Sequence, residues 1–191
     1  MTNEGLKEPF IDSEYSFKIV LIGDKMVGKT SLITRFVFDK FQGRYMGTIG
    51  LNVSTKNITI DINNNKYLVH LVIYDLASEE TFEDLFEPFS RGASGAIFVF
   101  DLTRKNTLES IEDWRIRLQK LTEGAINTNI YLIGNKLDLK ELREIKDEGQ
   151  MYAKEHNMIN YIETSAKDNL NIDEAFKEIT QKILFDAIKN N

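Results

Sequence analysis

The sequence predicts one α/β domain built on a mostly parallel sheet, and three observations lead to this fold class. Strand-like and helix-like segments alternate along the chain. Continuous apolar runs, such as AIFVF at 96–100 and IYLIG at 130–134, are typical of strands covered on both faces. The length of 191 residues lets one domain bury about 70% of its unfolded surface. We find no repeat, linker or second domain, so one wound sheet is expected.

The pattern predicts six strands and five helices. An apolar strand at 17–22 leads into a glycine-containing loop and a helix at 29–38. Strands at 51–61 and 67–75 flank the tripeptide NNN, which is typical of a hairpin, so they should pair antiparallel at one edge. The other strands are expected at 96–101, 129–134 and 159–163, and the other helices at 81–91, 106–122, 145–157 and 172–188. Helical spacing of apolar residues predicts the core face of the last helix: Ile172, Ala175, Phe176, Ile179, Ile183 and Leu184.

Composition and charge exclude several classes of function. The chain has no cysteine, which excludes disulfides, thiol catalysis and cysteine-ligated zinc and fits a reducing cytosolic setting. A net charge of -6 argues against nucleic-acid binding, which requires a basic surface. The two histidines, His70 and His156, are far apart in the sequence and predict no site. No apolar stretch is long enough to span a bilayer or to form a signal peptide, so we expect a cytoplasmic protein.

The run GDKMVGKT at 23–30 follows an apolar strand and opens a helix, which matches a phosphate-binding loop in residues and in context. Glycines at both ends let the backbone curl so that its N–H groups face an anion. Lys29 should reach the terminal phosphates, and the Thr30 hydroxyl should bind Mg²⁺. The residues expected to hold the phosphates are Lys25, Met26, Val27, Gly28, Lys29, Thr30 and Ser31.

Two later segments, each after a predicted strand, point to guanine. In GNKLD at 134–138, the Asp138 carboxylate can accept from both the ring N–H and the exocyclic amine, a donor pair that adenine lacks. Asn135 would tie this loop to the phosphate loop, and the Lys136 stem would cover the base. In ETSAK at 163–167, the residues expected at the base are Ser165, Ala166, through its backbone N–H, and Lys167. Alone, this second segment also fits an ordinary turn before a helix.

On these motifs the chain resembles a Ras-superfamily small GTPase, closest to the Rab branch, over about residues 15–188. The resemblance implies the P-loop NTPase (small G-protein) fold, with an extension at 1–15 and the G domain at 16–188. It also implies GTP/GDP and Mg²⁺ as cofactors, hydrolysis of GTP to GDP, and a molecular switch in vesicle trafficking. Within FQGRYMGTIG at 41–50, Phe41 matches the aromatic that packs on guanine, Tyr45 the one that closes over the phosphates, and Thr48 the ligand of Mg²⁺. The triplet TIG and the stretch RGASGAIFVFDLT at 91–103 are Rab-like.

The segment DLASEE at 75–80 departs from the family pattern DTAGQE. Asp75 is retained, so the resemblance gives Thr30, Thr48 and Asp75 as the Mg²⁺ site. Ser78 replaces a glycine whose N–H meets the γ-phosphate, and Glu79 replaces the glutamine that orients the attacking water. Glu79 and Lys29 are the catalytic candidates, and the hydrolysis rate stays open.

Lys25 stands where relatives carry a small residue. A cation there would either obstruct an arginine supplied by an activating protein or contribute charge in cis, by reaching the γ-phosphate or pairing with Glu79. The third alternative is a solvated side chain without an active role.

The resemblance implies an exchange factor, an activating protein and effectors that bind through the switch regions of a monomer. Three aromatics recur on the effector surface of Rab proteins, and the matching residues are Val53, Tyr74 and Phe89. Without cysteine this sequence cannot be prenylated, so either a tail is missing, or a partner provides membrane anchoring, or the protein works in the cytosol.

Two functions remain open from the sequence. The first is a GTP-hydrolysing switch. The second is a nucleotide-bound binding module that hydrolyses GTP slowly or not at all. An adenine-using P-loop kinase or ATPase is disfavoured by NKLD at 135–138 and by the lack of an arginine-rich lid.

Overall fold

The computed structural model describes residues 11–41, 51–76, 88, 90–122 and 129–190. It confirms the predicted α/β class with a six-stranded sheet in the order β2-β3-β1-β4-β5-β6. The strands are β1 (Ser13–Ile22), β2 (Leu51–Ile62), β3 (Asn65–Leu76), β4 (Gly95–Asp101), β5 (Ile130–Asn135) and β6 (Tyr161–Thr164). All neighbouring strands are parallel except β2 and β3, so the antiparallel edge is where the sequence predicts it.

Five α-helices lie in the described residues: α1 (Lys29–Phe38), α3 (Asn106–Glu109), α4 (Ile111–Leu121), α5 (Glu148–Glu155) and α6 (Ile172–Lys189). A short 3₁₀ helix, η2, spans Lys140–Leu142. The helix expected at 81–91 falls outside the described residues, apart from 88, 90 and 91.

The single helix expected at 106–122 is divided into α3 and α4 at Ser110. The one hydrogen of the Ser110 hydroxyl is shared between the main-chain oxygen of Asn106, at 2.7 Å, and the Asp24 carboxylate, at 2.6 Å. A serine that hydrogen-bonds back to the preceding turn competes with the helical ladder and often bends it. The helix expected at 145–157 is also shorter than predicted: α5 spans Glu148–Glu155.

The β2–β3 hairpin turns at Asn63 and Asn64, which have φ angles of 51° and 66°. Two consecutive residues with positive φ form the turn whose twist matches that of the flanking strands. Asparagine tolerates this conformation better than most residues, which is why the NNN sequence predicts the turn correctly.

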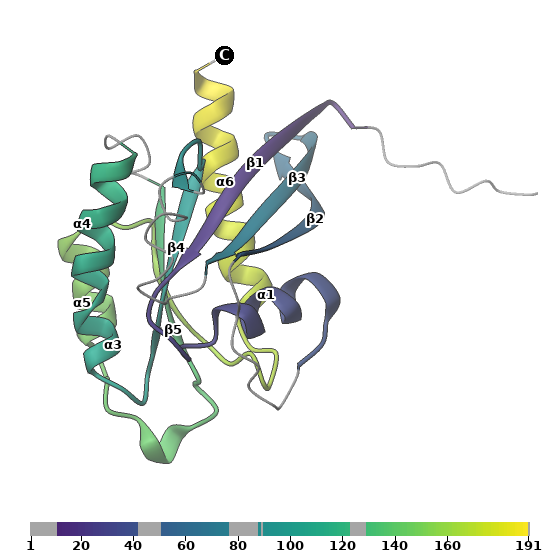
Figure 1. Ribbon diagram of the computed structural model, residues 1–191. Coiled ribbons are helices and arrows are strands. Elements are labelled where there is room, and N and C mark those ends of the chain that lie inside the picture. The colour runs from purple at the N-terminus through teal and green to yellow at the C-terminus, as the bar shows by residue number, and fades with distance from the viewer. Residues whose placement is uncertain (1–10, 42–50, 77–87, 89, 123–128, 191) are drawn as a thin grey trace, which may run out of the picture.

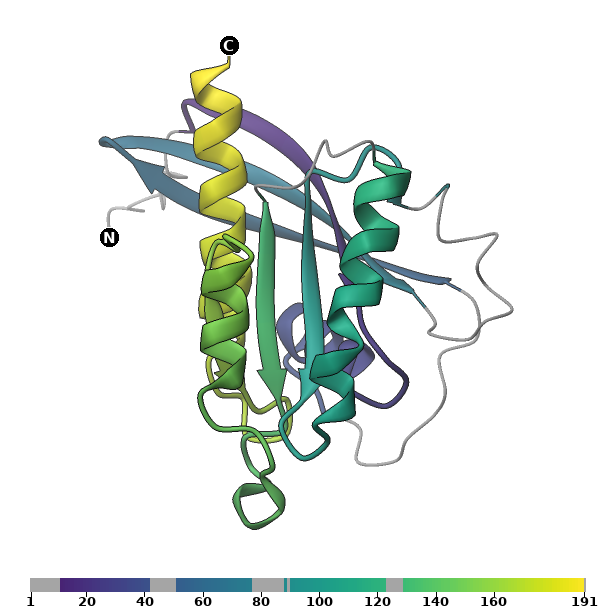
Figure 2. The same cartoon turned by 90° about the vertical axis from the view of Figure 1, so that its left-hand side faces the viewer.

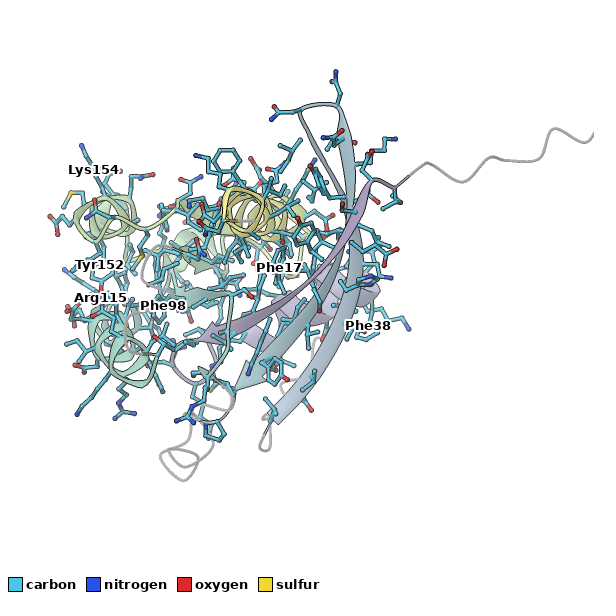
Figure 3. All side chains as sticks on the ribbon, turned by 90° about the horizontal axis from the view of Figure 1, so that it is seen from above. Phe17, Phe38, Phe98, Arg115, Tyr152 and Lys154 are labelled. Atoms are coloured by element: carbon cyan, nitrogen blue, oxygen red, sulfur yellow. The ribbon has the colours of Figure 1, made fainter. Side chains whose placement is uncertain are left out.

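The sheet separates two layers of helices (Figure 1). On one face, α1 and α6 pack on residues such as Phe17, Leu71 and Ile97. On the other face, α4 and α5 cover β4 and β5 (Figure 2). Phe98 belongs to the hydrophobic core on this face (Figure 3). All six apolar residues predicted for the core face of α6 are buried.

The parallel strands end at the lower edge of the molecule in Figure 1, where the loops after β1, β4 and β5 gather. In wound α/β sheets ligands bind at the carboxyl ends of the strands. Among the helices of the described residues, none has the length and hydropathy to cross a bilayer. β1 already begins at Ser13, inside the segment that the sequence assigns to the N-terminal extension.

Candidate nucleotide-binding site

The loop between β1 and α1 depends on two glycines with positive φ. Gly23 has a φ of 149°, and a Cβ atom there would overlap the main-chain oxygen of Val99. Gly28 has a φ of 102°, and a Cβ atom there would overlap the side-chain amide of Asn135. Both positions therefore require glycine for space as well as for conformation. The two ends of the loop therefore pack closely against β4 and β5, and its backbone N–H groups are the groups that a phosphate would need.

Lys29 is the first residue of α1, and its side chain, which is 7% exposed, reaches back into this loop. Its ammonium donates to the main-chain oxygens of Gly23, at 2.7 Å, and Asp24, at 3.0 Å. Burial lowers the pKa of Lys29 to about 8, against the opposing influence of the Asp75 and Asp24 carboxylates. The loop thus holds a cation at its centre at a desolvation cost that an anionic ligand would offset.

Thr30 and Asp75 bring two oxygen donors together at the start of α1. The Thr30 hydroxyl donates to Asp75 Oδ2 at 2.5 Å, and Asp75 is 1% exposed. Mg²⁺ prefers such hard oxygen ligands and commonly uses one or two of them besides water and phosphate. Among the described residues there is no cluster of three or more acidic, histidine or cysteine side chains that could hold a metal ion. Thr30 and Asp75 therefore fit a Mg²⁺ ion whose other ligands are water and phosphate oxygens.

Asn135, at the end of β5, connects three segments. Its Nδ2 donates to the main-chain oxygen of Val27 in the phosphate loop at 2.9 Å. Its Oδ1 accepts from the Thr164 hydroxyl at 3.1 Å and from the Ala166 amide at 3.4 Å. The side chain is 2% exposed, and both its nitrogen and its oxygen are hydrogen-bonded. The tie between the two loops that the sequence assigns to Asn135 is present.

Asp138 is oriented by the loop after β6. The Ser165 hydroxyl donates to Asp138 Oδ1 at 2.8 Å and accepts from the Asp168 amide at 3.0 Å. Asp138 itself is partly exposed. A fixed and partly exposed carboxylate is able to accept from paired donors of a base. Ser165 therefore contacts Asp138, whose carboxylate is the group expected to bind guanine.

Two arginines and a carboxylate that were not predicted from the sequence hold these loops. Arg35 of α1 donates to the main-chain oxygens of Ala166, at 3.0 Å, and Lys167, at 3.1 Å. Asp101, the last residue of β4, accepts from Lys136 Nζ at 2.7 Å and from Arg104 Nε at 2.8 Å. Asp101 could have been identified from the sequence, because it is a charged residue at the end of a buried parallel strand.

Asp24 in the phosphate loop is a further position that the sequence did not single out. Its carboxylate accepts from the Ser110 hydroxyl, at 2.6 Å, and from Trp114 Nε1, at 2.8 Å. The first turn of α4 therefore holds the outer side of the phosphate loop.

The remaining predicted site residues fall into two groups, those that the structure describes and those outside the described part of the chain. Lys25, Met26 and Lys167 are exposed, and Ser31 is partly buried in the first turn of α1. Phe41 is 39% exposed, with the Arg35 guanidinium 6.0 Å from its ring centre. Five predicted residues lie outside the described residues: Tyr45, Thr48, Ser78, Glu79 and Phe89.

The two described residues of the predicted effector surface are neighbours. Val53 of β2 lies directly opposite Tyr74 of β3, and Val53 is 50% exposed. The Lys18 ammonium lies 4.5 Å from the centre of the Tyr74 ring. Tyr74 is therefore partly covered by a cation of its own chain.

Comparison with known proteins places this geometry in a family. The sequence model of the Ras family matches residues 18–185. The chain is 36% identical to the Ras-related protein Rab-13 of Bos taurus over 183 residues, which cover 93% of this chain and 87% of that protein. It is 38% identical to the Ras-related protein Rab-11B of Dictyostelium discoideum over 182 residues, covering 94% and 79% of the two chains. It is 37% identical to the Ras-related protein YPTC6 of Chlamydomonas reinhardtii over 177 residues, covering 92% and 79%.

Proposed function

The chain belongs to the Ras family and is a Rab-like small GTPase, and on this premise we propose that it is a GTP/GDP switch whose nucleotide lies across the carboxyl ends of β1, β4, β5 and β6. One observation carries the proposal: the hydrogen bond from Asn135 to Val27 joins a base-recognition loop to a phosphate loop. A nucleotide suits this arrangement, with its base at one loop and its phosphates at the other.

Guanine is recognised by the loop after β5. Asp138 accepts from the two guanine donors, Lys136 lies along the base, and Ala166 offers its backbone N–H to the guanine oxygen. The Ser165 hydroxyl supports this assignment, because it fixes one oxygen of Asp138 and so orients the carboxylate.

The phosphates are held by Lys29 and by the backbone of residues 25–31, and Mg²⁺ by Thr30, Asp75 and Thr48. When bound, Mg²⁺ supplies positive charge to neutralise the phosphates. Lys29 adds the charge of a side chain that is already desolvated within the loop. By the family pattern, Phe41 would border the base and Tyr45 the phosphates.

The hydrolysis step is where this chain departs from its relatives. Glu79 can accept a hydrogen bond from water but cannot donate one to a phosphate oxygen, and Ser78 makes the backbone less permissive than glycine does. Lys25 lies on the exposed rim of the phosphate loop, where a cation would affect the same step. A binding module with very slow hydrolysis is therefore the second candidate function.

The switch acts through an exchange factor, an activating protein and effectors. Val53 and Tyr74 support an interaction surface, because they are cross-strand neighbours and Val53 is half exposed. The Rab-like identity supports a role in vesicle trafficking, with membrane association through partners.

The test begins with the purified protein and the identity of its bound nucleotide. GDP or GTP would support the proposal, and an adenine nucleotide would overturn it. An Asp138→Asn variant should lose at least about a hundredfold in guanine-nucleotide affinity, because its amide presents a donor to the guanine amine.

Hydrolysis is then followed as phosphate release in single turnover for the natural protein and for Glu79→Gln. Faster release in Glu79→Gln would support Glu79 as the residue that limits the rate. GTP that persists for hours in both proteins would favour the binding module.

A further inference from the structure

We propose that Arg104 is a positioning residue that ties the phosphate loop to the base-recognition loop and thereby slows nucleotide release. This inference rests on the proposed function, and it assigns a regulating contact to a residue outside both loops.

Arg104 forms hydrogen bonds in two directions. Its Nε donates to Asp101 Oδ2 at 2.8 Å, and its Nη2 donates to the main-chain oxygen of Lys25 at 3.1 Å. Asp101 Oδ2 also accepts from Lys136 Nζ at 2.7 Å. The path from Lys25 to Lys136 therefore runs through one guanidinium and one carboxylate.

Asp101 is a rigid anchor for this path. Its side chain is 1% exposed, and its second oxygen accepts from the Thr103 amide at 2.9 Å and the Thr103 hydroxyl at 2.7 Å. Burial acts to raise the pKa of Asp101, but hydrogen bonds from Lys136, Thr103 and Arg104 lower it below its ordinary value. The carboxylate thus stays ionised between its two cations.

The register of the sheet places this anchor beside the base-recognition loop. Asp101 ends β4 directly next to Asn135 of β5, and the Leu102 amide donates to the Asn135 main-chain oxygen at 3.0 Å. Lys136 follows Asn135 with a φ of 72°, a conformation uncommon for lysine. The bond to Asp101 helps to hold Lys136 in that conformation, where its stem is available to the base.

An arginine is needed for this tie. The planar guanidinium offers several N–H groups in fixed directions, so one side chain can hold Asp101 and Lys25 together. A lysine at position 104 would place one charge near Asp101 but would lack the fixed second direction toward Lys25. Arg104 is 36% exposed, so replacing it leaves the buried core intact.

Release of a fluorescent GDP analogue, chased with excess GDP, tests the tie. Arg104→Ala should release the nucleotide about tenfold faster, as expected for the loss of a charge-assisted hydrogen bond. Arg104→Lys should release it nearly as fast as Arg104→Ala. Full rescue by lysine would overturn the tie, because it would show that charge beside Asp101 is sufficient.

The matched control is Arg115→Ala. Arg115 also pairs with a carboxylate three residues earlier, through bonds of 2.6 and 2.9 Å to Glu112, but it lies between α4 and α5 (Figure 3). We expect its release rate to match that of the natural protein. An equal acceleration in Arg104→Ala and Arg115→Ala would overturn the proposal, because it would indicate a general loosening of the fold.

A double-mutant cycle tests whether Arg104 acts through Lys136. In a Lys136→Ala background, Arg104→Ala should accelerate release by less than about threefold, because residues that share one path are not additive. Full additivity would overturn the coupling.

The two proposals fail in different ways. Natural protein that retains no guanine nucleotide would overturn the proposed function and this inference with it. Natural protein that retains GDP and releases it at the same rate as Arg104→Ala would overturn only the tie.

Discussion

The side-chain amide of Asn135 donates to the main-chain oxygen of Val27 at 2.9 Å, although the two residues are 108 positions apart in the sequence. The contact exists because Gly28, the neighbour of Val27, has no Cβ atom and leaves room for the Asn135 amide. It brings the loop after β1 and the loop after β5 into one site. Three of the predictions below concern this contact and its surroundings, and a fourth concerns the β2–β3 turn.

Replacing Asn135 by alanine should weaken both the fold and nucleotide binding. The change leaves the Val27 oxygen and the Thr164 hydroxyl without this buried partner, which costs about 2 kcal/mol or more in unfolding free energy. Urea denaturation and GDP release measure the two effects. Unchanged values in both would contradict the role of Asn135 as the link between the loops.

Replacing Gly28 by alanine should disrupt the site, since the new Cβ would overlap the Asn135 amide and the φ of 102° strains any side chain. We expect nucleotide affinity to fall by about a hundredfold, a loss near 3 kcal/mol. Gly92→Ala is the control: Gly92 also has a positive φ, of 71°, but a Cβ there meets nothing within 4 Å. That variant should lose only about 1 kcal/mol of stability and keep its nucleotide affinity.

Lys29→Met should stabilise the nucleotide-free protein at pH 7 while removing phosphate binding. The pKa of Lys29 is lowered from 10.5 to about 8, so the unfolded chain binds more protons than the folded one between these pH values. The stability of the natural protein therefore rises with pH over that interval, and the cost of burying the cation is complete below pH 8. The difference from Lys29→Met, about 1 to 3 kcal/mol at pH 7, should shrink towards pH 10. Urea denaturation at several pH values measures it, and a difference that grows with pH would contradict the assignment.

Asn64→Gly in the β2–β3 turn should stabilise the protein by about 0.5 kcal/mol, because glycine adopts a φ of 66° without steric cost. Asn64→Val should destabilise it by more than about 1 kcal/mol, since a branched side chain is strained in that region. Thermal unfolding of both variants checks the sign. Equal melting temperatures would mean that the turn conformation does not limit stability.

Much of the fold can be predicted from the sequence because its signals are local. Apolar runs mark β4 and β5, whose residues are buried throughout, and helical spacing marks the core face of α6. The division of α3 from α4 at Ser110 is not predictable in this way, because it involves a hydrogen bond to Asp24, 86 positions away.

The candidate site likewise contains residues with a local sequence signal and residues whose contacts depend on distant segments. Gly23, Gly28, Lys29 and Thr30 stand at fixed spacing, and NKLD follows a buried strand, so these residues are recognisable from the sequence. Arg104, Asp101 and Arg35 lie in segments with no such spacing, and their roles depend on which loops the sheet order places together.

The sequence by itself determined that this chain forms a wound α/β domain, and it predicted a phosphate loop and a guanine-recognition motif. Those features are set by backbone conformation and by the hydrophobic periodicity of short segments. Only the tertiary structure decided that Asp101 holds Lys136 and that Arg104 reaches Lys25. The physical reason is that hydrogen bonds between distant segments depend on strand order and register, which bring β1, β4 and β5 to the same edge.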